Sequence, residues 1–489
     1  MTTTTADVYE TTVGLEIHVE LATDSKMFCG CAVSFGGDPN TRTCPVCLGL
    51  PGSLPVPNER AVEYTMKIGL ALNCEIARRS LFHRKNYFYP DMPKNYQISQ
   101  YDLPLCYGGI VEISGDFGTT RVGITRVHLE EDTGKSIHVG GTGRIADSDY
   151  SLEDFNRAGT PLVEIVSEPD IRSAEEARAF VTELRAILES LGVSDVRMEE
   201  GSLRVDANVS VRRSGETEHG AKIEVKNMNS IRSVARALAF EERRQRDALE
   251  AGESLVQETR HFDEKSGTTS SMRTKEYAFD YRYFPEPDLV PLEPSEEWIE
   301  RVRSSLPELP AQRRARFARD YGLNEADVRV LTASTKTADW FEEAASAYGG
   351  EAKKVVNWIT ADLYGLLNEA GIELWESKVT PAGLAGLIKL VDDGTISGKQ
   401  AKVVLAEMFE SGADPGAIAT ARGLEQVSDA SAIEVAVDEV IDENADAAEK
   451  VRAGQMGTIG FLVGQVMKKT QGRANPQLVN DLLRSKLTS

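Results

Sequence analysis

The sequence changes its hydrophobic periodicity across one proline-rich stretch, and this change constrains the fold more than any other feature. Up to about residue 290, runs in which every second residue is apolar predict strands with one buried face, mixed with loops and a few helices. Residues 283–294 (YFPEPDLVPLEP) contain four prolines, which helix interiors and central strands exclude. Beyond residue 295, Ala-, Glu-, Lys- and Leu-rich segments with Gly or Pro stops indicate helices. The sequence therefore predicts an α+β region followed by an all-α region.

Four segments are expected to be strands with one polar face: residues 13–21, 125–131, 202–212 and 221–227. In the first, Glu16 and His18 share the polar face, about 7 Å apart along the strand. Asp206, Glu224 and Glu130 lie on the polar faces of the other three. A helix is expected from Ser173, which forms a capping-box pattern with Glu176, to Gly192.

These acidic faces are candidates for a divalent metal site. Glu16 and His18 with Asp206 or Glu224 offer the carboxylates and single histidine that suit Mg²⁺ or Mn²⁺. Glu130 and Glu131 add carboxylates at a strand end. Such metal sites act in phosphoryl transfer from nucleoside triphosphates, although the chain has neither a Walker motif nor a GxGxxG turn. The competing interpretation is a solvated acidic face, which is the commoner situation for any single glutamate.

Four of the six cysteines cluster in the sequence as Cys29, Cys31, Cys44 and Cys47. A C-x-C pair and a C-x2-C pair joined by a Gly-, Pro- and Asn-containing loop let four thiolates converge on one tetrahedral Zn²⁺. With all four positions filled, such a site is structural and not catalytic. The alternative is four unrelated buried thiols.

The net charge of 55 − 77 = −22 excludes a protein that coats nucleic acid non-specifically. The charge is unevenly distributed, because residues 429–449 hold eight acidic side chains and no basic one, whereas residues 450–489 hold seven basic ones against Asp481, or 7 − 1 = +6. A local basic cluster is typical of a nucleic-acid contact, and equally of a solvated helix face. We expect no membrane span and a cytoplasmic location, because no apolar run approaches about 18 residues and no secretory signal is visible.

The motifs resemble those of one family, the B subunits (GatB) of the tRNA-dependent amidotransferase GatCAB. The matching stretches cover nearly the whole chain: VGLEIHVEL, FCGC, TRTCPVCLGLPGSLPV, RKNYFYPDMPKNYQISQYD, TRVHLEEDTGKS, FNRAGTPLVEIVSEPD, GSLRVDANVSVR, KIEVKNMNS, SMRTKEYAFDYRYFPEPDL and MGTIGFLVGQVMKKTQGRANP. The resemblance implies a glutamine-synthetase-like cradle of antiparallel sheets with helices at residues 1–294, with a zinc-binding insertion near 29–47. It further implies a helical domain at 295–410 and a YqeY-like tail for tRNA binding at 411–489.

The resemblance also implies a function, a ligase that forms carbon–nitrogen bonds with glutamine as amido donor (EC 6.3.5.-). This chain would bind misacylated Glu-tRNA(Gln), Asp-tRNA(Asn) or both and phosphorylate the side-chain carboxylate with ATP. Ammonia would come from the GatA glutaminase subunit, with GatC as the third member of the heterotrimer. The residue roles implied are catalysis and Mg²⁺ (or Mn²⁺) binding by Glu16, His18, Glu131, Asp206 and Glu224, further metal candidates Glu130 and Glu164, nucleotide contacts by Lys85 and Arg273, and Zn²⁺ binding by the four clustered cysteines.

Two other functions compete with this one. In the first, the chain is a non-catalytic tRNA-binding or assembly subunit of the same complex. In the second, it is a stand-alone ATP-dependent ligase that joins a carboxylate and an amine on a small molecule. The basic tail and the lack of a recognisable glutaminase nucleophile count against the second function.

Overall fold

The computed structural model describes residues 8–140, 148–218, 220–274, 278–424, 430–470, 474 and 476–488. The chain divides into two compact units, residues 1–310 and residues 311–489. The first unit combines sheets with helices and the second contains helices, so the predicted α+β and all-α regions are confirmed. No helix in the described ranges is long and apolar enough to cross a membrane.

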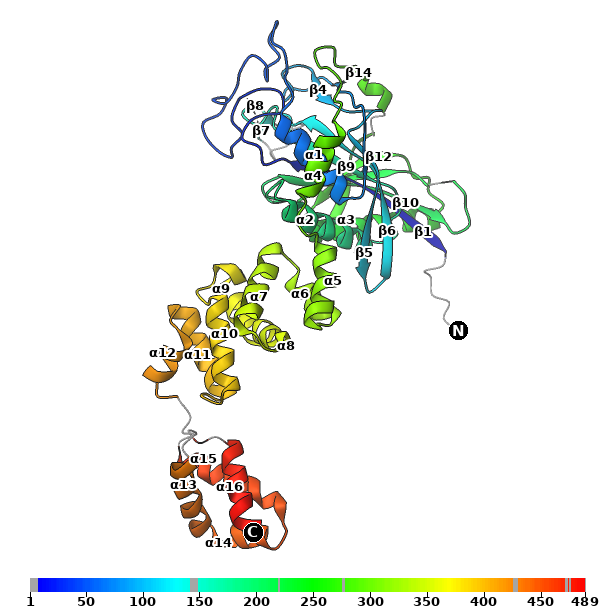
Figure 1. Ribbon diagram of the computed structural model, residues 1–489. Coiled ribbons are helices and arrows are strands. Elements are labelled where there is room, and N and C mark those ends of the chain that lie inside the picture. The colour runs from blue at the N-terminus through cyan, green and yellow to red at the C-terminus, as the bar shows by residue number, and fades with distance from the viewer. Residues whose placement is uncertain are drawn as a thin grey trace. The chain divides into compact units, whose positions relative to one another are not determined.

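The largest sheet of the first unit has nine strands in the order β13-β12-β11-β10-β1-β9-β6-β5-β2 (Figure 1). The sequence predicts antiparallel sheets, and the described neighbours are antiparallel except β11 and β12. Those two run parallel because helix α3 (Ile231–Glu250) carries the chain back between them. The strands are β1 (Tyr9–Glu20), β2 (Glu75–Ile76), β5 (Cys106–Gly115), β6 (Gly118–Glu131), β9 (Pro161–Ser167), β10 (Leu203–Arg213), β11 (Ile223–Met228), β12 (Glu258–Asp263) and β13 (Thr268–Thr274).

One face of this sheet is apolar and lies against helices. Val13, Leu15, Ile17 and Val19 of β1 are fully buried there, as the alternation predicts. They share one core with side chains of α1 (Glu59–Ala71), α2 (Ala174–Leu191) and α3. Because successive strand residues point to opposite faces, the polar residues of β1 are left on the other face, where the candidate site lies.

Helix α2 begins and ends where the sequence predicts. The Ser173 hydroxyl accepts the backbone N–H of Glu176 at 3.1 Å, and Gly192 ends the helix at φ 64°. The carboxylate of Glu176 accepts the N–H of Arg172 at 2.9 Å, one residue earlier than the capping box requires. The helix start is therefore stabilised by a variant of the predicted cap.

Two smaller sheets accompany the large sheet. One has the order β14-β3-β4 (Phe284–Pro285, His83–Asn86 and Tyr96–Ser99), and the other pairs β7 (Lys135–Val139) with β8 (Tyr150–Asp154). Strand β4 packs against β6. This packing brings Ser99 of the small sheet to the polar face of β6.

The proline-rich stretch does not end the first unit. Helix α4 (Glu296–Ser304) follows it, and Ile299 and Val302 of this helix belong to the core beneath the large sheet. The unit extends to residue 310, beyond the domain end predicted at residue 294. Prolines interrupt the hydrogen-bonding pattern without preventing the next helix from folding back onto the core.

The second unit contains two separate hydrophobic cores, one within residues 317–419 and one within 433–487. Ile418 and Ala419 belong to the first core, so the boundary predicted at 410/411 would divide that core. The α-helices are α5 (Pro310–Tyr321), α6 (Glu325–Leu331), α7 (Thr335–Tyr348), α8 (Ala352–Asn357), α9 (Tyr364–Ala370), α10 (Pro381–Asp392), α11 (Gly398–Ser411), α12 (Pro415–Ala421), α13 (Ala430–Glu443), α14 (Ala445–Arg452), α15 (Ile459–Lys469) and α16 (Pro476–Thr488).

Candidate metal and nucleotide site

Three neighbouring strands align His18, Glu164 and His128 in one row across the polar face of the large sheet. His18 of β1 is paired with Glu164 of β9, which is paired in turn with His128 of β6. Glu130 follows two residues after His128 and therefore points to the same face. The side chains of His128, Glu130 and Glu164 are buried.

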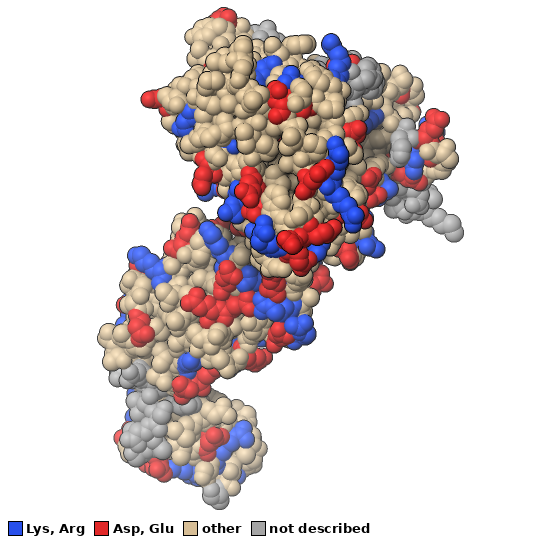
Figure 2. All heavy atoms as spheres, turned by 45° about the horizontal axis from the view of Figure 1, so that its top comes forward, with Lys and Arg blue, Asp and Glu red and all other residues tan. Residues whose placement is uncertain are grey.

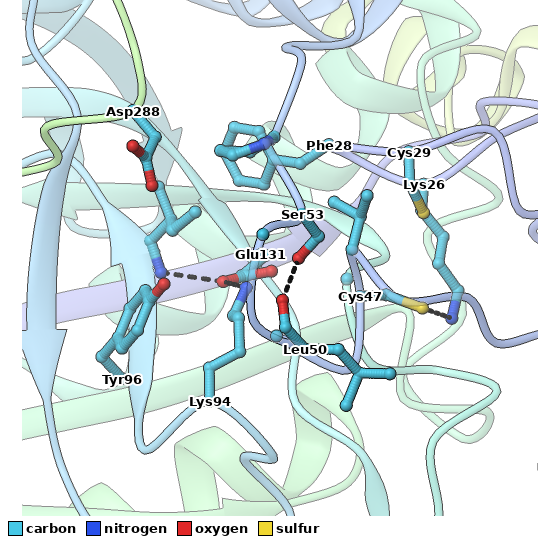
Figure 3. A pocket seen from close by; sticks show the side chains of 16 residues that line it. Lys26, Phe28, Cys29, Cys47, Leu50, Ser53, Lys94, Tyr96, Glu131 and Asp288 are labelled. Atoms are coloured by element: carbon cyan, nitrogen blue, oxygen red, sulfur yellow. Dashed lines mark hydrogen bonds and ion pairs between the residues drawn. The ribbon is translucent and has the colours of Figure 1, made fainter.

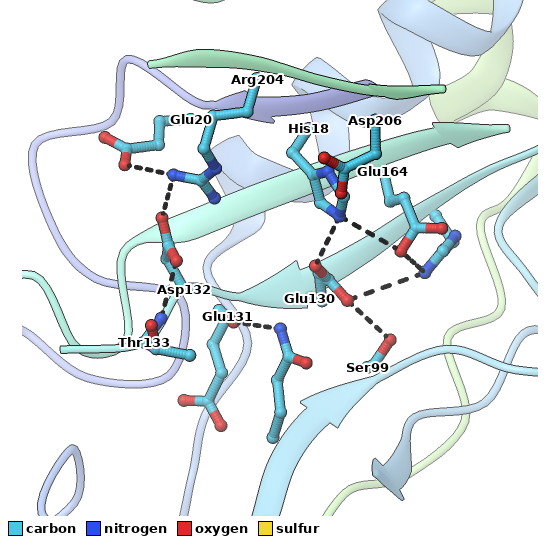
Figure 4. A network of polar contacts seen from close by, with 12 residues as sticks. His18, Glu20, Ser99, Glu130, Glu131, Asp132, Thr133, Glu164, Arg204 and Asp206 are labelled. Atoms are coloured by element: carbon cyan, nitrogen blue, oxygen red, sulfur yellow. Dashed lines mark hydrogen bonds and ion pairs between the residues drawn. The ribbon is translucent and has the colours of Figure 1, made fainter. Parts of the chain in front are cut away.

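The side chains of His18, Glu130 and Glu164 converge on one point. The Nε2 atom of His18 lies 3.6 Å from Oε2 of Glu164 and 3.9 Å from Oε1 of Glu130. One ligand atom from each of the three lies within 4.8 Å of the others, a spacing that a single divalent cation bridges. Figure 4 shows the three side chains turned toward one another from three strands. Two carboxylates and one imidazole are a donor set that fits Mg²⁺ or Mn²⁺.

His128 belongs to this group, although it was not among the predicted site residues. Its Nε2 lies 3.6 Å from Oε2 of Glu164 and 3.9 Å from Oε2 of Glu130. Burial lowers the pKa of His128 to about 3, so the ring is neutral. The Nε–H of Arg126 points to His128 Nδ1 at 3.4 Å, which leaves the ring proton on Nε2, facing the two carboxylates. The signal in the sequence is its position two residues before Glu130, on the same strand face.

Two imidazoles and the Lys85 ammonium act on the two buried carboxylates. Burial opposes the ionisation of Glu164, but the interactions with His128 and His18 outweigh burial and hold the pKa of Glu164 well below its usual value. Burial raises the pKa of Glu130, whose Oε2 accepts the Ser99 hydroxyl at 3.1 Å. Burial likewise opposes the charge of Lys85, but Glu130, Tyr283 and Glu164 outweigh it and raise the pKa of Lys85. The predicted nucleotide contact Lys85 is therefore a charged ammonium within the field of the candidate metal ligands.

Glu16, Asp206 and Glu224 lie on the neighbouring strands β1, β10 and β11, in a second group that contains Lys226. The Lys226 ammonium forms ion pairs with Asp206 and, at 3.6 Å, with Oε1 of Glu224. The Asn208 amide donates to Oε1 of Glu16 at 2.9 Å. Lys226 follows Glu224 by two residues on one strand face, a spacing from which its place in the group could have been predicted. The ammonium of Lys226 therefore balances part of the negative charge of this group, and the predicted metal binding by Glu16, Asp206 and Glu224 stays a prediction.

The Glu224 carboxylate is also held by the next strand of the sheet. The Thr259 hydroxyl of β12 donates to Oε2 of Glu224 at 2.7 Å, and Thr259 is buried. Arg273 is paired with Thr259 across β12 and β13. The side chain of Arg273 lies outside the described part of the chain, so the predicted phosphate contact stays a prediction.

Glu131 does not join His18, contrary to expectation. Its carboxylate forms an ion pair with Lys94 and accepts the N–H of Ile98 at 2.9 Å. These groups line a cavity of about 190 Å³ (Figure 3). The reason is geometric, because adjacent residues on a strand point to opposite faces and Glu130 occupies the face of His18.

Asp132 points to a third neighbourhood. Its Oδ2 lies 2.9 Å from NH1 of Arg204 and 3.9 Å from Nε of Arg157. Burial, together with the negative charge of Asp132, raises the pKa of the neighbouring Glu20 to about 8. The three consecutive carboxylates 130–132, which form one acidic run in the sequence, thus serve three separate environments.

The four clustered cysteines converge as the spacing predicts. Their sulfur atoms all lie within 4.8 Å of one another, and those of Cys44 and Cys47 are 3.8 Å apart. A tetrahedral zinc with Zn–S bonds of about 2.3 Å requires sulfur–sulfur distances of about 3.8 Å. A hydrogen bond from Cys29 lowers the pKa of Cys47 to about 4, whereas burial raises the pKa of Cys31 to about 11. Geometry and donor type both fit a structural zinc centre.

In the tail, the acidic and basic segments pair with each other. Lys469 of α15 contacts Glu439 at 2.8 Å and Glu443 at 2.6 Å, and Lys486 of α16 contacts Glu434 at 2.9 Å. All three carboxylates belong to α13. Part of the +6 charge is therefore neutralised within the tail. The basic side chains that are exposed there include Lys450, Arg452, Lys468 and Arg484.

Comparison with known proteins places these sites in matched regions. A family model described as the GatB/GatE catalytic domain matches residues 11–300, which include both candidate metal groups and the cysteines. The GatB_Yqey model, described as the GatB domain, matches residues 339–487 and so begins within the predicted middle domain.

Relatives similar over the whole length are named as B subunits of aspartyl/glutamyl-tRNA(Asn/Gln) amidotransferases. The protein from Carboxydothermus hydrogenoformans is 54% identical over 479 residues, which cover 98% of this chain and 99% of the relative. The proteins from Caldanaerobacter subterraneus subsp. tengcongensis and Moorella thermoacetica are each 55% identical, over 98% of this chain and 99% and 100% of their own lengths.

Proposed function

Because the chain belongs to the GatB family of amidotransferase B subunits, we propose that it acts in the tRNA-dependent conversion of Asp-tRNA(Asn), Glu-tRNA(Gln) or both to the amidated forms. The activity is that of a ligase that takes its nitrogen from glutamine. The observation that carries the proposal is the convergence of His18, Glu130 and Glu164 near the charged Lys85, within the region matched by a catalytic-domain model.

The chemistry requires activation, because a carboxylate is a poor electrophile toward ammonia. One side-chain oxygen of the tRNA-bound aspartate or glutamate attacks the γ-phosphorus of ATP, and the bond to ADP breaks. Ammonia then attacks the carbonyl carbon of the acyl phosphate, and inorganic phosphate leaves with the bonding electron pair. The products are the amide, ADP and phosphate.

Each residue has a defined role in this proposal. His18, Glu130 and Glu164 hold Mg²⁺ or Mn²⁺, and a bound cation would screen the oxygens of the transferred phosphoryl group. Lys85 neutralises phosphate charge beside them, and Arg273 remains proposed for the same task. His128 keeps the Glu130 and Glu164 carboxylates in place by facing both. Glu131, paired with Lys94, is not part of this ligand set.

Glu16, Asp206 and Glu224 are proposed as the second acidic group of the same reaction. Lys226 balances the charge of Asp206 and Glu224. A second cation brought in with ATP would compete with this ammonium for the carboxylates. Lys226 therefore lowers the affinity of this group for the second cation. The four cysteines are proposed to hold a structural zinc ion that fixes residues 29–47.

We further propose the partners that this chemistry needs. A glutaminase subunit, GatA, supplies ammonia, and GatC completes the heterotrimer. The exposed basic side chains Lys450, Arg452, Lys468 and Arg484 of the tail contact the tRNA backbone. A cytoplasmic location, where tRNA is charged, fits this role.

Amidation of Glu-tRNA(Gln) and Asp-tRNA(Asn) by the reconstituted complex, with and without ATP, tests the proposal. We expect ADP release that depends on misacylated tRNA and disappears in Lys85→Ala. If ADP release persists unchanged in Lys85→Ala and His18→Ala complexes, this chain is the non-catalytic tRNA-binding member of the complex. If ADP forms on a free amino acid without tRNA, the small-molecule ligase is correct.

A further inference from the structure

Lys26 is a lysine whose ammonium lies inside the protein beside the cysteine cluster. The residue is 1% exposed. Nζ donates to the carbonyl oxygen of Arg42 at 2.8 Å, to that of Phe155 at 3.1 Å and to Sγ of Cys47 at 3.7 Å. Figure 3 shows the side chain reaching to the Cys47 sulfur. All three N–H donors of the ammonium are thus in use.

The charge of Lys26 has no carboxylate to balance it among the described residues, where its partners are the two carbonyls and the sulfur. Burying an ammonium without a counter-charge is costly. Four thiolates around one Zn²⁺ carry a formal charge of about −2, which supplies the missing counter-charge. The positive charge of Lys26 and the negative charge of the zinc-bound cysteine centre therefore offset each other.

The same ammonium joins the cysteine segment to the chain that leads into β9. The Phe155 carbonyl belongs to residues 155–160, the connection between β8 and β9. The backbone N–H of Asn40 donates to Oδ1 of Asp154 at 2.9 Å, and that of Arg42 donates to Oδ1 of Asn156 at 2.8 Å. Lys26 lies where these two segments meet.

Gly159 lies against both Lys26 and Cys47. Its φ is +87°, a conformation that favours glycine, and a Cβ there would lie in ordinary van der Waals contact, 3.4 Å from Cδ of Lys26 and 3.6 Å from Cβ of Cys47. The N–H of Met27 also donates to the Gly159 carbonyl at 2.7 Å. The connection therefore packs directly on both the lysine and a cysteine of the centre.

We propose that Lys26 stabilises the metal centre without binding the metal: it donates to the Cys47 thiolate, offsets the charge of the four thiolates and fastens residues 155–160 to the loaded site. This inference rests on the proposed zinc binding by Cys29, Cys31, Cys44 and Cys47. Through residues 155–160, loss of the metal would loosen the start of β9, the strand that carries Glu164.

Zinc transfer from the full-length chain to a chromogenic chelator tests the proposal. We compare wild type with Lys26→Met, which keeps the side-chain length but removes charge and donors. Residues that hydrogen-bond to metal ligands typically contribute about 10–100-fold to affinity, so we expect the Lys26→Met chain to bind zinc more weakly by about that factor. Lys135→Met is the matched control, because Lys135 is exposed on β7, and it should bind zinc like wild type.

Amide hydrogen exchange on the wild-type chain gives a second test that needs no variant to fold. Removal of zinc should speed exchange in residues 155–160 and leave the β5–β6 hairpin unchanged. If Lys26→Met and wild type bind zinc with equal affinity, Lys26 does not stabilise the metal centre. If the exchange rate of residues 155–160 is the same with and without zinc, the metal centre does not stabilise this connection. A wild-type chain that binds no zinc refutes the zinc proposal itself, which is a distinct outcome.

Discussion

Glu164 occupies the most constrained position of the candidate site. One of its oxygens lies 3.6 Å from both His18 and His128, and the other lies 3.6 Å from NH2 of Arg126. The side chain is buried and its ionised form is favoured by the two histidines. A carboxylate in this setting binds a cation through charge and geometry together, because the dielectric screening of water is largely absent.

We therefore predict that Glu164→Gln abolishes most of the tRNA-dependent ADP release of the complex. The substitution keeps the shape but removes one ligand charge, and loss of one preorganised electrostatic group costs about 100-fold or more in rate. ADP release and glutaminase activity without ATP are measured side by side, and only the first should fall. Glu112→Gln, at an exposed position on β5, is the control. Wild-type ADP release by Glu164→Gln would remove Glu164 from the ligand set.

At the scale of elements, the parallel pair β11–β12 has a function in the proposed chemistry. It places Thr259 beside Glu224, where the threonine hydroxyl donates to the carboxylate at 2.7 Å. Thr259→Val is expected to raise KM for ATP about tenfold, because a hydrogen bond to a charged group contributes about 1.5 kcal/mol. Thr259→Ser, which keeps the hydroxyl, should restore most of the affinity. A Thr259→Val enzyme with unchanged KM and kcat would show that the hydrogen bond from Thr259 to Glu224 does not contribute to ATP binding or catalysis.

Helices α5 and α7 are joined by one carboxylate. Glu342 accepts from Arg316 at 3.0 Å and from the Tyr321 hydroxyl at 3.3 Å. The hydrogen bond from Arg316, with help from Arg313 and against partial burial, lowers the pKa of Glu342 to about 2. A depressed pKa stabilises the fold fully above about pH 4.5 and loses that contribution as the pH falls through about 2.

Glu342→Gln should therefore destabilise residues 311–489 at pH 7 by about 1 kcal/mol, a value reduced by solvent screening. The variant should also lose stability less steeply than wild type as the pH falls from about 5 to about 2. Trp340, buried in the same core, provides the fluorescence signal for urea unfolding. Parallel acid profiles for the two proteins would contradict the assignment.

Alternation in the sequence was sufficient to predict strands, their buried faces and the helix after Ser173, because these depend on local periodicity. It was not sufficient to align His18 with Glu164, since that pairing joins residues far apart in the chain through strand register.

The acidic run 130–132 is misleading for a related reason, because neighbours along a strand face opposite sides of the sheet. The pairing of Lys226 with Asp206 and Glu224 likewise depends on how the strands lie side by side, and the metal expected at these carboxylates stays a prediction. The convergence of the four cysteines could be predicted because it depends on short spacings along the chain. The structure brings their four sulfur atoms together.

At the scale of the whole molecule, the charge of −22 is a mixture of signs and not a uniform field. On the face shown in Figure 2, basic and acidic side chains lie close together over the surface. In the tail, two lysines are engaged by α13. A tRNA contact must therefore use the basic side chains that remain exposed.

Replacement of Lys450, Arg452 and Lys468 by glutamine should weaken tRNA binding and reduce the slope of log K against log salt by about 0.7–0.9 for each phosphate that is no longer neutralised. The double variant Lys469→Gln and Lys486→Gln, which removes the lysines already paired with α13, should change the slope less. Filter binding across a salt series measures both. Equal slopes for the two variants would mean that the internal ion pairs do not decide which charges face tRNA.

Removal of the tail is best made after residue 424. Ile418 and Ala419 pack in the core within residues 317–419, whereas residues 433–487 have a core of their own. We expect a chain truncated after 424 to retain the melting behaviour of the remaining helices and to bind tRNA weakly. A chain truncated after 410 should unfold at lower temperature, as differential scanning calorimetry will show. If both truncations melt alike, α12 contributes little to that core.

The distribution of Glu130, Glu131 and Asp132 over three neighbourhoods limits how this protein can change in length. A point substitution in the run disturbs one neighbourhood and leaves the other two intact. Insertion or deletion of a single residue before position 130 would shift the strand end by one residue. Each carboxylate would then point to the opposite face of the sheet and lose its present partners. Insertions and deletions in homologous chains should therefore be absent from this segment and collect in loops such as the β5–β6 turn, where the direction of a side chain matters less.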